Sequence, residues 1–234
     1  QASNWYKKAA DQEHVMAQNN LGDMYYNGEG VAQDFTQAHH WYEKAALQGH
    51  LNAQNILGDI YFNGQGVTQD FKKSREWVER AAEQGLAIAQ FNLGMLYYHG
   101  YGVSQDLNKA REWVERAAKQ DLAIAQFNLG VMYDEGKVCT QDLNKANKWY
   151  RKAAVQGDLN AQNTLGEMYY LGDGFTQDFS KALEWFEKAA QQGHAGAQNH
   201  IGYIYEKGQG VTQNFIKALE WFEKAAQQGH AGAQ

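Results

Sequence analysis

Tryptophan recurs along this chain at a constant interval of 36 residues, with no insertion or deletion in any interval. The seven tryptophans are Trp5, Trp41, Trp77, Trp113, Trp149, Trp185 and Trp221. A glycine and a tyrosine keep the same step from Gly22 and Tyr25 onwards. Periods of roughly 20 to 50 residues are typical of solenoids, in which each repeat buries its apolar face against its neighbours. The spacing therefore predicts a row of stacked repeats in place of one closed core.

A glycine-rich loop recurs with the same period, as HGYGVSQD does at residues 99–106. Such loops between regular elements can cradle phosphate groups with their backbone N–H groups. This loop, however, occurs six times and lacks the Lys-Ser/Thr pair that follows the glycines of a P-loop. We therefore interpret it as a turn. The chain has 24 glycines and no proline, so its turns depend on Gly, Asn and Asp.

Each repeat is predicted to consist of two helices, the first of which covers residues 53–63 in the second repeat. Its apolar side chains fall at i, i+4, i+7 and i+8, which is one helical face. They are Ala53, Leu57, Ile60 and Tyr61. Gly58 stands in the middle of this helix, where glycine costs about 1 kcal/mol relative to alanine. Its recurrence predicts that a neighbouring helix approaches too closely for a Cβ atom.

The second helix of the same repeat is predicted over residues 71–84. Gly64 ends the first helix, and Val67 fills the gap between the two helices. Asp70 is the expected N-cap of the second helix, where its carboxylate accepts hydrogen bonds from free N–H groups. One face of the second helix is small or apolar and is expected to be buried: Phe71, Ser74, Trp77, Val78 and Ala81. Gly85 then closes the repeat.

The recurring pattern AxxxLGxxYxxGxGVxQDxxxAxxWxxxAA resembles the Sel1-like repeat, a relative of the tetratricopeptide repeat. The resemblance covers nearly the whole chain. It implies an all-α fold, a right-handed α/α superhelix or solenoid of helix-turn-helix repeats, whose first helices line a concave groove. Family members are mostly adaptors that hold partner proteins or peptides. We expect one solenoid, with a partial repeat at 1–13, six full repeats at 14–229 and the start of a further repeat at 230–234.

The sequence departs from the family pattern in a few places. Val138 replaces the second glycine of one loop, which puts the conformation of that loop in doubt if the position needs a positive φ. Glu13 and Asp121 replace helix-ending glycines, and Asp tolerates the left-handed conformation better than Glu. Asn214 replaces a capping Asp, which is a nearly neutral exchange. The cysteine pairs of the cysteine-rich members are missing, since Cys139 is the single cysteine of the chain.

Charge and hydropathy argue against two classes of partner. The net charge is −6 with no run of five like charges, so the chain lacks the basic face that nucleic acid or an anionic membrane would need. No apolar run approaches the roughly 18 residues that span a bilayer. We interpret a chain that starts at Gln1 as a processed mature form or an excised fragment. Bacterial members of the resembled family are often exported, so the resemblance implies a bacterial periplasmic or secreted protein, with the cytoplasm as the alternative.

A second face of each first helix is expected to line the groove, at three positions that we call the groove columns. In each repeat they follow the spacing i, i+4 and i+7, beside the buried face. From the first repeat to the sixth they are Asn19, Asp23 and Tyr26; Asn55, Asp59 and Phe62; Phe91, Met95 and Tyr98; Phe127, Val131 and Asp134; Asn163, Glu167 and Tyr170; and Asn199, Tyr203 and Glu206.

The groove columns predict a binding surface for a peptide. Asn at the outer repeats can donate to and accept from an extended peptide backbone. Phe91, Met95, Phe127 and Val131 form an expected apolar patch with carboxylates on either side, which is a common mark of a binding surface. We hypothesise that the third and fourth repeats take a hydrophobic side chain of a protein or peptide partner, with basic residues nearby. The alternative is that Phe91 and Phe127 pack on neighbouring helices.

The remaining aromatic and reactive residues are expected to be structural. The tryptophans lie opposite a charged face, which favours core packing over carbohydrate stacking. One column of histidines sits near the turns, but neighbouring helices lie roughly 8–10 Å apart, too far to share a zinc ion. Those histidines are His14, His50, His194 and His230. We predict no metal site, cofactor or catalytic residue, since GxSxG and SxxK motifs are missing. Cys139 is expected to be a small buried hydrophobe, with a reactive thiol as the alternative.

Three functions stay open at this point. The favoured one is a non-enzymatic scaffold or adaptor that binds a protein or peptide segment in the groove. The second is a weak hydrolase of the β-lactam or cell-wall type, an activity linked to some cysteine-rich members of the resembled family. The third is a spacer that self-associates end to end, because apolar residues such as Trp5, Ala231 and Ala233 flank the two ends.

Overall fold

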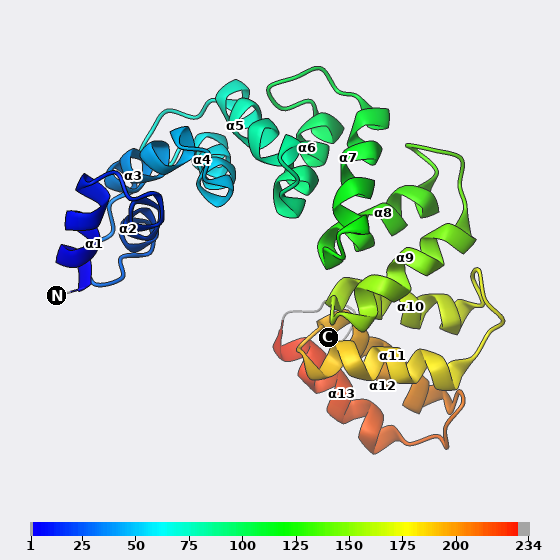
Figure 1. The fold of residues 1–234 in the computed structure, drawn as a ribbon. Helices are drawn as coiled ribbons and strands as arrows, with labels where there is room; N and C mark the ends of the chain where they lie inside the picture. The colour runs from blue at the N-terminus through cyan, green and yellow to red at the C-terminus, as the bar shows by residue number, and fades with distance from the viewer. Residues whose placement is uncertain (1, 229–234) are drawn as a thin grey trace. The chain divides into compact units, whose positions relative to one another are not determined.

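The computed structural model describes residues 2–228, with side chains from residue 5 onwards. This part of the chain forms thirteen helices and no strand (Figure 1). The helices are α1 (Ala2–Asp11), α2 (Val15–Asn27), α3 (Phe35–Leu47), α4 (Leu51–Asn63), α5 (Phe71–Glu83), α6 (Ala87–His99), α7 (Leu107–Lys119), α8 (Ala123–Glu135), α9 (Leu143–Val155), α10 (Leu159–Leu171), α11 (Phe179–Gln191), α12 (Ala195–Lys207) and α13 (Phe215–Gln227). The predicted fold class is confirmed: the chain is an all-α solenoid of helix-turn-helix repeats.

The helices are grouped into two compact units, Gln1–Gln120 and Asp121–Gln234. Helices α2, α4, α6, α8, α10 and α12 are the first helices of the repeats, and α3, α5, α7, α9, α11 and α13 are the second helices. Within the first unit, the first helices lie along one side of the row and the second helices along the other (Figure 1). The repeat boundaries at 1–13, 14–229 and 230–234 stay a prediction, and residues 230–234 lie outside the described part.

A glycine in the middle of each first helix sets how closely the two helices of a repeat pack. A Cβ atom on Gly94 would lie 2.7 Å from Cγ2 of Val114 and 3.0 Å from the carbonyl oxygen of Ala110. In four other repeats the same position faces a ring of the second helix: Tyr42, Tyr150, Phe186 and Phe222. The predicted close approach is confirmed, and it explains why a residue that weakens a helix recurs there.

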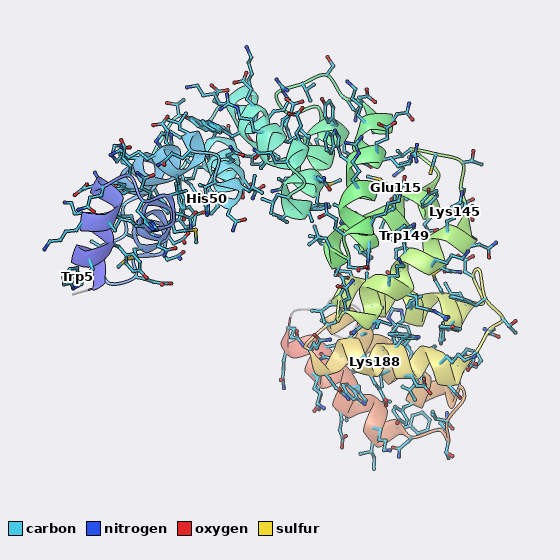
Figure 2. All side chains as sticks on the ribbon, in the orientation of Figure 1. Trp5, His50, Glu115, Lys145, Trp149 and Lys188 are labelled. Carbon is cyan, nitrogen blue, oxygen red and sulfur yellow. The ribbon has the colours of Figure 1, made fainter. Side chains whose placement is uncertain are left out.

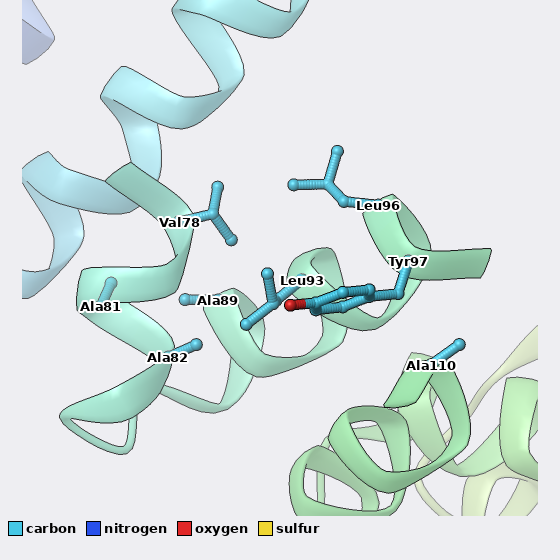
Figure 3. Packing of buried hydrophobic residues seen from close by; sticks show 8 residues of the cluster. All are labelled: Val78, Ala81, Ala82, Ala89, Leu93, Leu96, Tyr97 and Ala110. Atoms are coloured by element: carbon cyan, nitrogen blue, oxygen red, sulfur yellow. The ribbon is translucent and has the colours of Figure 1, made fainter. Parts of the chain in front are cut away.

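Each repeat closes its core with one large aliphatic residue and several alanines. Figure 3 shows Leu93 and Tyr97 of α6 with Val78 of α5 and Ala110 of α7. Leu93 is fully buried, which stabilises the fold by about 1.5–3 kcal/mol. Small side chains between the helices let the backbones approach, so the large residues interlock without leaving gaps.

A ladder of glutamine pairs, each made of one buried and one exposed Gln, runs along the repeats and was not predicted from the sequence. Gln54 of α4 donates from Nε2 to the carbonyl oxygen of Ala46 at 3.1 Å, and its Oε1 accepts from Nε2 of Gln84 at 3.1 Å. The pairing occurs in every repeat, at Gln18–Gln48, Gln54–Gln84, Gln90–Gln120, Gln126–Gln156, Gln162–Gln192 and Gln198–Gln228. Carbonyls in the last turn of a helix lack an intrahelical partner, so a buried amide that bonds them satisfies both groups.

The loop after each first helix is fixed by its Gln-Asp pair. In the second repeat, Nε2 of Gln69 donates to the carbonyl oxygen of Phe62 at 2.7 Å. Asp70 accepts from the N–H groups of Lys72 and Lys73 at 3.0 Å, and its own N–H donates to the carbonyl oxygen of Tyr61 at 2.9 Å. The predicted N-cap is therefore confirmed, and the same cap holds where Asn214 replaces Asp.

The departures from the repeat pattern have different consequences. Glu13 and Asp121 adopt positive φ values of 63° and 60°, so both reproduce the conformation of the glycines that they replace. They are the non-glycine residues with positive φ in the described part of the chain, so Val138 does not take the left-handed conformation. The loop that holds Val138 therefore differs from its counterparts, in which the second glycine has a φ near 70°.

The expectation that all seven tryptophans are core residues is wrong for part of the column. Trp41 is 5% exposed, whereas Trp5 is 72% exposed and the other five are half-buried. Figure 2 labels Trp5 in α1 and Trp149 in α9. From Trp41 onwards, the Lys or Arg three residues later covers the open face of each ring, with its cation 4.0–4.8 Å from the centroid. Exposed cation–π pairs of this kind contribute roughly 0.5–1 kcal/mol each.

Two glycines of α12 offer a matched test of the helix packing. We expect Gly202→Ala to lower the free energy of unfolding by about 1–3 kcal/mol, because the new Cβ would lie 2.5 Å from the ring of Phe222. Gly196→Ala, in the same helix, should change it by less than about 1 kcal/mol, because the helix propensity of Ala offsets a tighter contact of the new Cβ, 3.1 Å from Cε1 of His194. Urea unfolding of both variants measures this. A Gly202→Ala variant as stable as the parent would contradict the packing account.

Candidate functional site

The first positions of the groove columns are mostly covered by neighbouring side chains. Asn19, Asn55, Phe91 and Asn199 are buried, and Phe127 and Asn163 are half-buried. The amides of Asn19, Asn55 and Asn163 donate within their own helix to the carboxylate four residues later. The expectation that these Asn side chains are open to a peptide backbone is therefore wrong for the three buried ones.

The second and third positions of the groove columns are the accessible ones. Tyr203 is 40% exposed. The rest are half-buried: Asp23, Tyr26, Asp59, Phe62, Met95, Tyr98, Val131, Asp134, Glu167, Tyr170 and Glu206. A partner that lies along the first helices would therefore meet these two rows and not the first one.

The predicted apolar patch of the third and fourth repeats is divided between the two units. Phe91 and Met95 belong to the first unit, where Phe91 is 8% exposed. Phe127 and Val131 belong to the second unit, where both pack against its core and Phe127 lies 5.6 Å from the ring of Tyr150. Phe127 thus packs on a neighbouring helix, as the alternative predicts for it, and Phe91 is buried.

A cavity of about 290 Å³ opens on the groove columns of the first unit. Helices α4, α5 and α6 and the residue after the α6 C-cap form its walls: Asp59, Phe62, Ser74, Val78, Asn92, Met95, Leu96, His99 and Tyr101. Three of these were predicted as groove residues, namely Asp59, Phe62 and Met95. The other lining residues were not predicted to belong to a site.

The Asp59 carboxylate is the charged group of this cavity. Burial raises its pKa to about 6 from an ordinary value of 3.8. In the described part of the chain, the side chain that reaches it is Asn55, whose Nδ2 donates to Oδ2 at 3.5 Å, the long limit of a hydrogen bond. Nδ2 of Asn92 in turn donates to Oδ1 of Asn55 at 3.0 Å. Asp59 is thus a half-buried carboxylate with weak compensation.

Two other carboxylates of the groove columns, the equivalent Asp23 and the third-position Asp134, have a strong partner that Asp59 lacks. Asp23, 36 residues earlier, accepts from the hydroxyl of Tyr42 at 2.6 Å. Asp134 of the second unit accepts from the hydroxyl of Tyr150 at 3.0 Å. In the second repeat the place of Tyr42 is taken by Val78, which cannot donate a hydrogen bond. The exchange removes both a ring and a donor from the surroundings of Asp59.

An aromatic wall closes one side of the cavity. The ring of Phe62 lies 5.1 Å from that of Phe71 and 5.4 Å from that of Tyr101, and Phe71 stacks on Tyr101 at 5.0 Å. In the first repeat the same pair of positions is polar, and the hydroxyl of Tyr26 donates to Oε1 of Gln65. The second repeat therefore replaces a hydrogen bond with an aromatic contact.

The histidines and the cysteine that were expected to be structural lie at helix starts and in a loop. His50 and His194 accept the N–H groups of Ala53 and Ala197 at their Nδ1 atoms, so they cap α4 and α12; His230 lies outside the described residues. Cys139 is half-buried, and its thiol donates to the carbonyl oxygen of Met132 at 3.7 Å. Among the residues that the structure describes, His, Cys, Asp and Glu form no group of three or more that could hold a metal ion.

A helix long and apolar enough to cross a membrane is not found in the described part of the chain. The family model of the Sel1 repeat matches the sequence seven times, at residues 1–14, 15–50, 51–86, 87–122, 123–158, 159–194 and 195–230. The chain belongs to the Sel1 repeat family. Sel1 repeats form a scaffold that generally serves protein interaction. No protein of curated function matches the chain.

Two solved structures are similar to this Sel1 repeat chain over almost all of its length. One is c5321, a protective antigen of uropathogenic Escherichia coli strains, which is 42% identical with a TM-score of 0.91. The match covers 98% of this chain but 49% of that one, so this chain spans about half the length of the E. coli protein. The other is a Sel1 repeat protein from Oxalobacter formigenes, 35% identical with a TM-score of 0.89, which covers 96% of this chain and 92% of that one.

An immunity protein of Pseudomonas aeruginosa, Pa5087, shares the fold at 18% identity and a TM-score of 0.56, over 91% of this chain and 84% of that one.

A comparison of the repeats with one another would have revealed the missed residues. Val78 stands where four repeats have Tyr or Phe and the third repeat has Val114, and Tyr101 stands where two repeats have Gln. Each exchange is visible in the sequence at a step of 36 residues. The signal is that Phe62, Val78 and Tyr101 differ together from the matching residues 36 positions earlier, although they belong to different elements.

The raised pKa of Asp59 predicts a pH dependence of stability. The folded state binds a proton more tightly than the unfolded state, so the free energy of unfolding should fall as the pH rises from about 4 to about 6 and stay level above. We expect Asp59→Asn to remove this loss, so its stability relative to the parent should rise by about 1–3 kcal/mol across that interval.

Urea unfolding of the variant and the parent at pH 4 and pH 7 measures the difference between their free energies of unfolding. The contributions of the other titrating groups cancel in this difference. Asp173→Asn, at an exposed loop position, is the control and should show no such change. A difference between Asp59→Asn and the parent that is the same at both pH values would contradict the burial of this charge.

Proposed function

We propose that this chain is a non-enzymatic adaptor that binds an extended protein segment along the first helices of its repeats. The observation that carries the proposal is the cavity at Asp59, Phe62 and Met95, because it opens on the face where the groove columns are accessible. Concave, largely apolar sites with a few polar groups are the usual form of a binding pocket.

Within the first unit, the first helices follow one another along one side of the row, which suits an extended ligand. At the roughly 8–10 Å spacing of packed helices, an extended chain, which advances about 3.3 Å per residue, would pass from one helix to the next in about three residues. Its side chains could then enter equivalent positions in successive repeats, which would make affinity depend on several small contacts.

The charges of the accessible rows favour a basic partner. The second and third positions include five carboxylates and no Lys or Arg: Asp23, Asp59, Asp134, Glu167 and Glu206. The whole chain has a net charge of −6. Electrostatic complementarity of this kind speeds association and selects partners more than it adds affinity.

Peptides selected from a random library against the full chain test the proposal. Met95→Arg fills the cavity and places a cation on the face that lacks one, so it should weaken the selected peptides by about tenfold or more, which corresponds to about 1.4 kcal/mol. Gln37→Arg makes a comparable change of charge at an exposed position of the second helix α3 and should leave their affinity unchanged. Fluorescence anisotropy with labelled peptides measures both.

Equal affinity for the parent and for Met95→Arg, or a larger loss with Gln37→Arg, would overturn the proposal. Phe91→Ala is a poor test of binding, because Phe91 is buried and its removal should cost about 3–5 kcal/mol of stability.

A further inference from the structure

The cavity of the first unit lies where the second repeat departs from the first. In the first repeat, the ring of Tyr42 packs on Gly22, within 2.7 Å of the place of a Cβ, and its hydroxyl donates to Asp23. In the second repeat the matching glycine faces the short side chain of Val78. Val78 and Asp59 both line the cavity, so the space and the donor that Tyr42 supplies in one repeat are both missing in the next.

Two further exchanges border the same cavity. Phe62 replaces the third-position Tyr, and Tyr101 replaces the loop Gln to which that Tyr donates elsewhere. Both exchanges turn a polar contact into an aromatic one, with ring centroids 5.4 Å apart. The exchanges in α4, α5 and the loop after α6 meet at one place and line one cavity, whereas the third repeat shares only the valine, at Val114.

The chemistry of the pocket is that of a single carboxylate among apolar walls. Asp59 provides the negative charge, and its contact in the described part is an amide at 3.5 Å. The apolar wall consists of Val78, Leu96 and Met95, and the aromatic wall of Phe62 and Tyr101. A buried carboxylate without a cation or a strong donor is unfavourable, so a ligand that supplies one is stabilised there.

We propose that this pocket takes an arginine side chain of the bound segment, with the guanidinium on the Asp59 carboxylate and the aliphatic stem along Met95 and Leu96. The proposal rests on the adaptor function proposed above and specifies the side chain that this cavity recognises.

Arginine fits the walls better than the two other donors of suitable size. Its planar guanidinium stacks on aromatic faces such as Phe62 and Tyr101, is weakly hydrated, and can bond both oxygens of a carboxylate. The ammonium of lysine is a strongly hydrated point charge and loses more on entering an apolar pocket. A tyrosine could replace the missing hydroxyl of Tyr42, but it would leave the charge of Asp59 without a counterion.

The binding should weaken in acid. Besides Asp59, the titratable side chains that line the cavity are His99 of α6 and Tyr101 of the following loop; α5 contributes Ser74 and Val78. Burial raises the pKa of Asp59 to about 6, so acidification below that value removes the charge with which the guanidinium pairs. A bound cation stabilises the ionised carboxylate and moves this midpoint downward.

Amide NMR titrations of the full chain with small probes test the proposal. We expect Nα-acetyl-arginine methylamide to give saturable shifts at the backbone amides around Asp59, Val78 and Leu96. The citrulline analogue has the same shape without the charge and should bind about tenfold more weakly or worse. The lysine and tyrosine analogues should also bind more weakly than arginine. Equal binding of citrulline, or tighter binding of tyrosine or lysine, would overturn the proposal.

Three variants locate the binding. Val78→Tyr restores the residue of the first repeat, and we expect it to raise the melting temperature and abolish the arginine shifts, because the ring fills the pocket and its hydroxyl bonds Asp59. Asp59→Asn keeps the shape, removes the charge and should also abolish the shifts, so the test holds even if Val78→Tyr does not fold. Asp173→Asn, at an exposed loop position outside the groove columns, is the control and should leave them unchanged. Arginine binding that survives Asp59→Asn would contradict the proposal.

The outcomes separate this proposal from the adaptor function. If Met95→Arg weakens the binding of the selected peptides while Asp59→Asn does not, the adaptor function is supported and the arginine pocket is contradicted. If the arginine probe binds through Asp59 while the affinity of no selected peptide depends on Met95, the pocket is supported and the adaptor function is contradicted.

Discussion

The contact between the glycine of each first helix and the side chain that faces it from the following second helix is the constraint on which this solenoid depends. It brings two backbones so close that a Cβ on Gly94 would meet both a side chain and a carbonyl of α7. Once this distance is set, the alanines can pack between the helices and the glutamine pairs can form their hydrogen bonds. The same geometry recurs every 36 residues, so each repeat reproduces its neighbours without a long-range core.

That constraint also explains how a repeat can acquire a site without losing its fold. The residue that faces the glycine can be a ring, as at Tyr42, or a short side chain, as at Val78, because the glycine contact survives both. A short side chain leaves a cavity on the accessible side of the first helices. In this Sel1 repeat chain the cavity lies beside Asp59, a carboxylate whose equivalent in the first repeat is bonded by a hydroxyl. Packing and recognition thus depend on one position.

Much of the fold could be predicted from the sequence because it repeats. The period located the helix pairs, and the local chemistry of Gly58 and Asp70 located the close contact and the N-cap. The groove was predicted less well. Helical spacing shows which residues share a face, but not how far a neighbouring helix covers it, so the burial of Asn55 was missed. The prediction that all the tryptophans are buried failed for the same reason. Trp5, for example, has no preceding second helix in the described chain to cover it.

The cavity escaped prediction because it arises from a difference between repeats, whereas the sequence pattern shows what they share. Its central feature is a half-buried carboxylate without a strong partner. Titration of the Asp59 carboxyl carbon, followed by NMR in the unmodified chain, tests this directly. The account predicts a midpoint near pH 6, because burial raises the pKa of this group. A midpoint near the ordinary value of 3.8 would show that the carboxylate is solvated, which would contradict both the pocket and the ligand proposed for it.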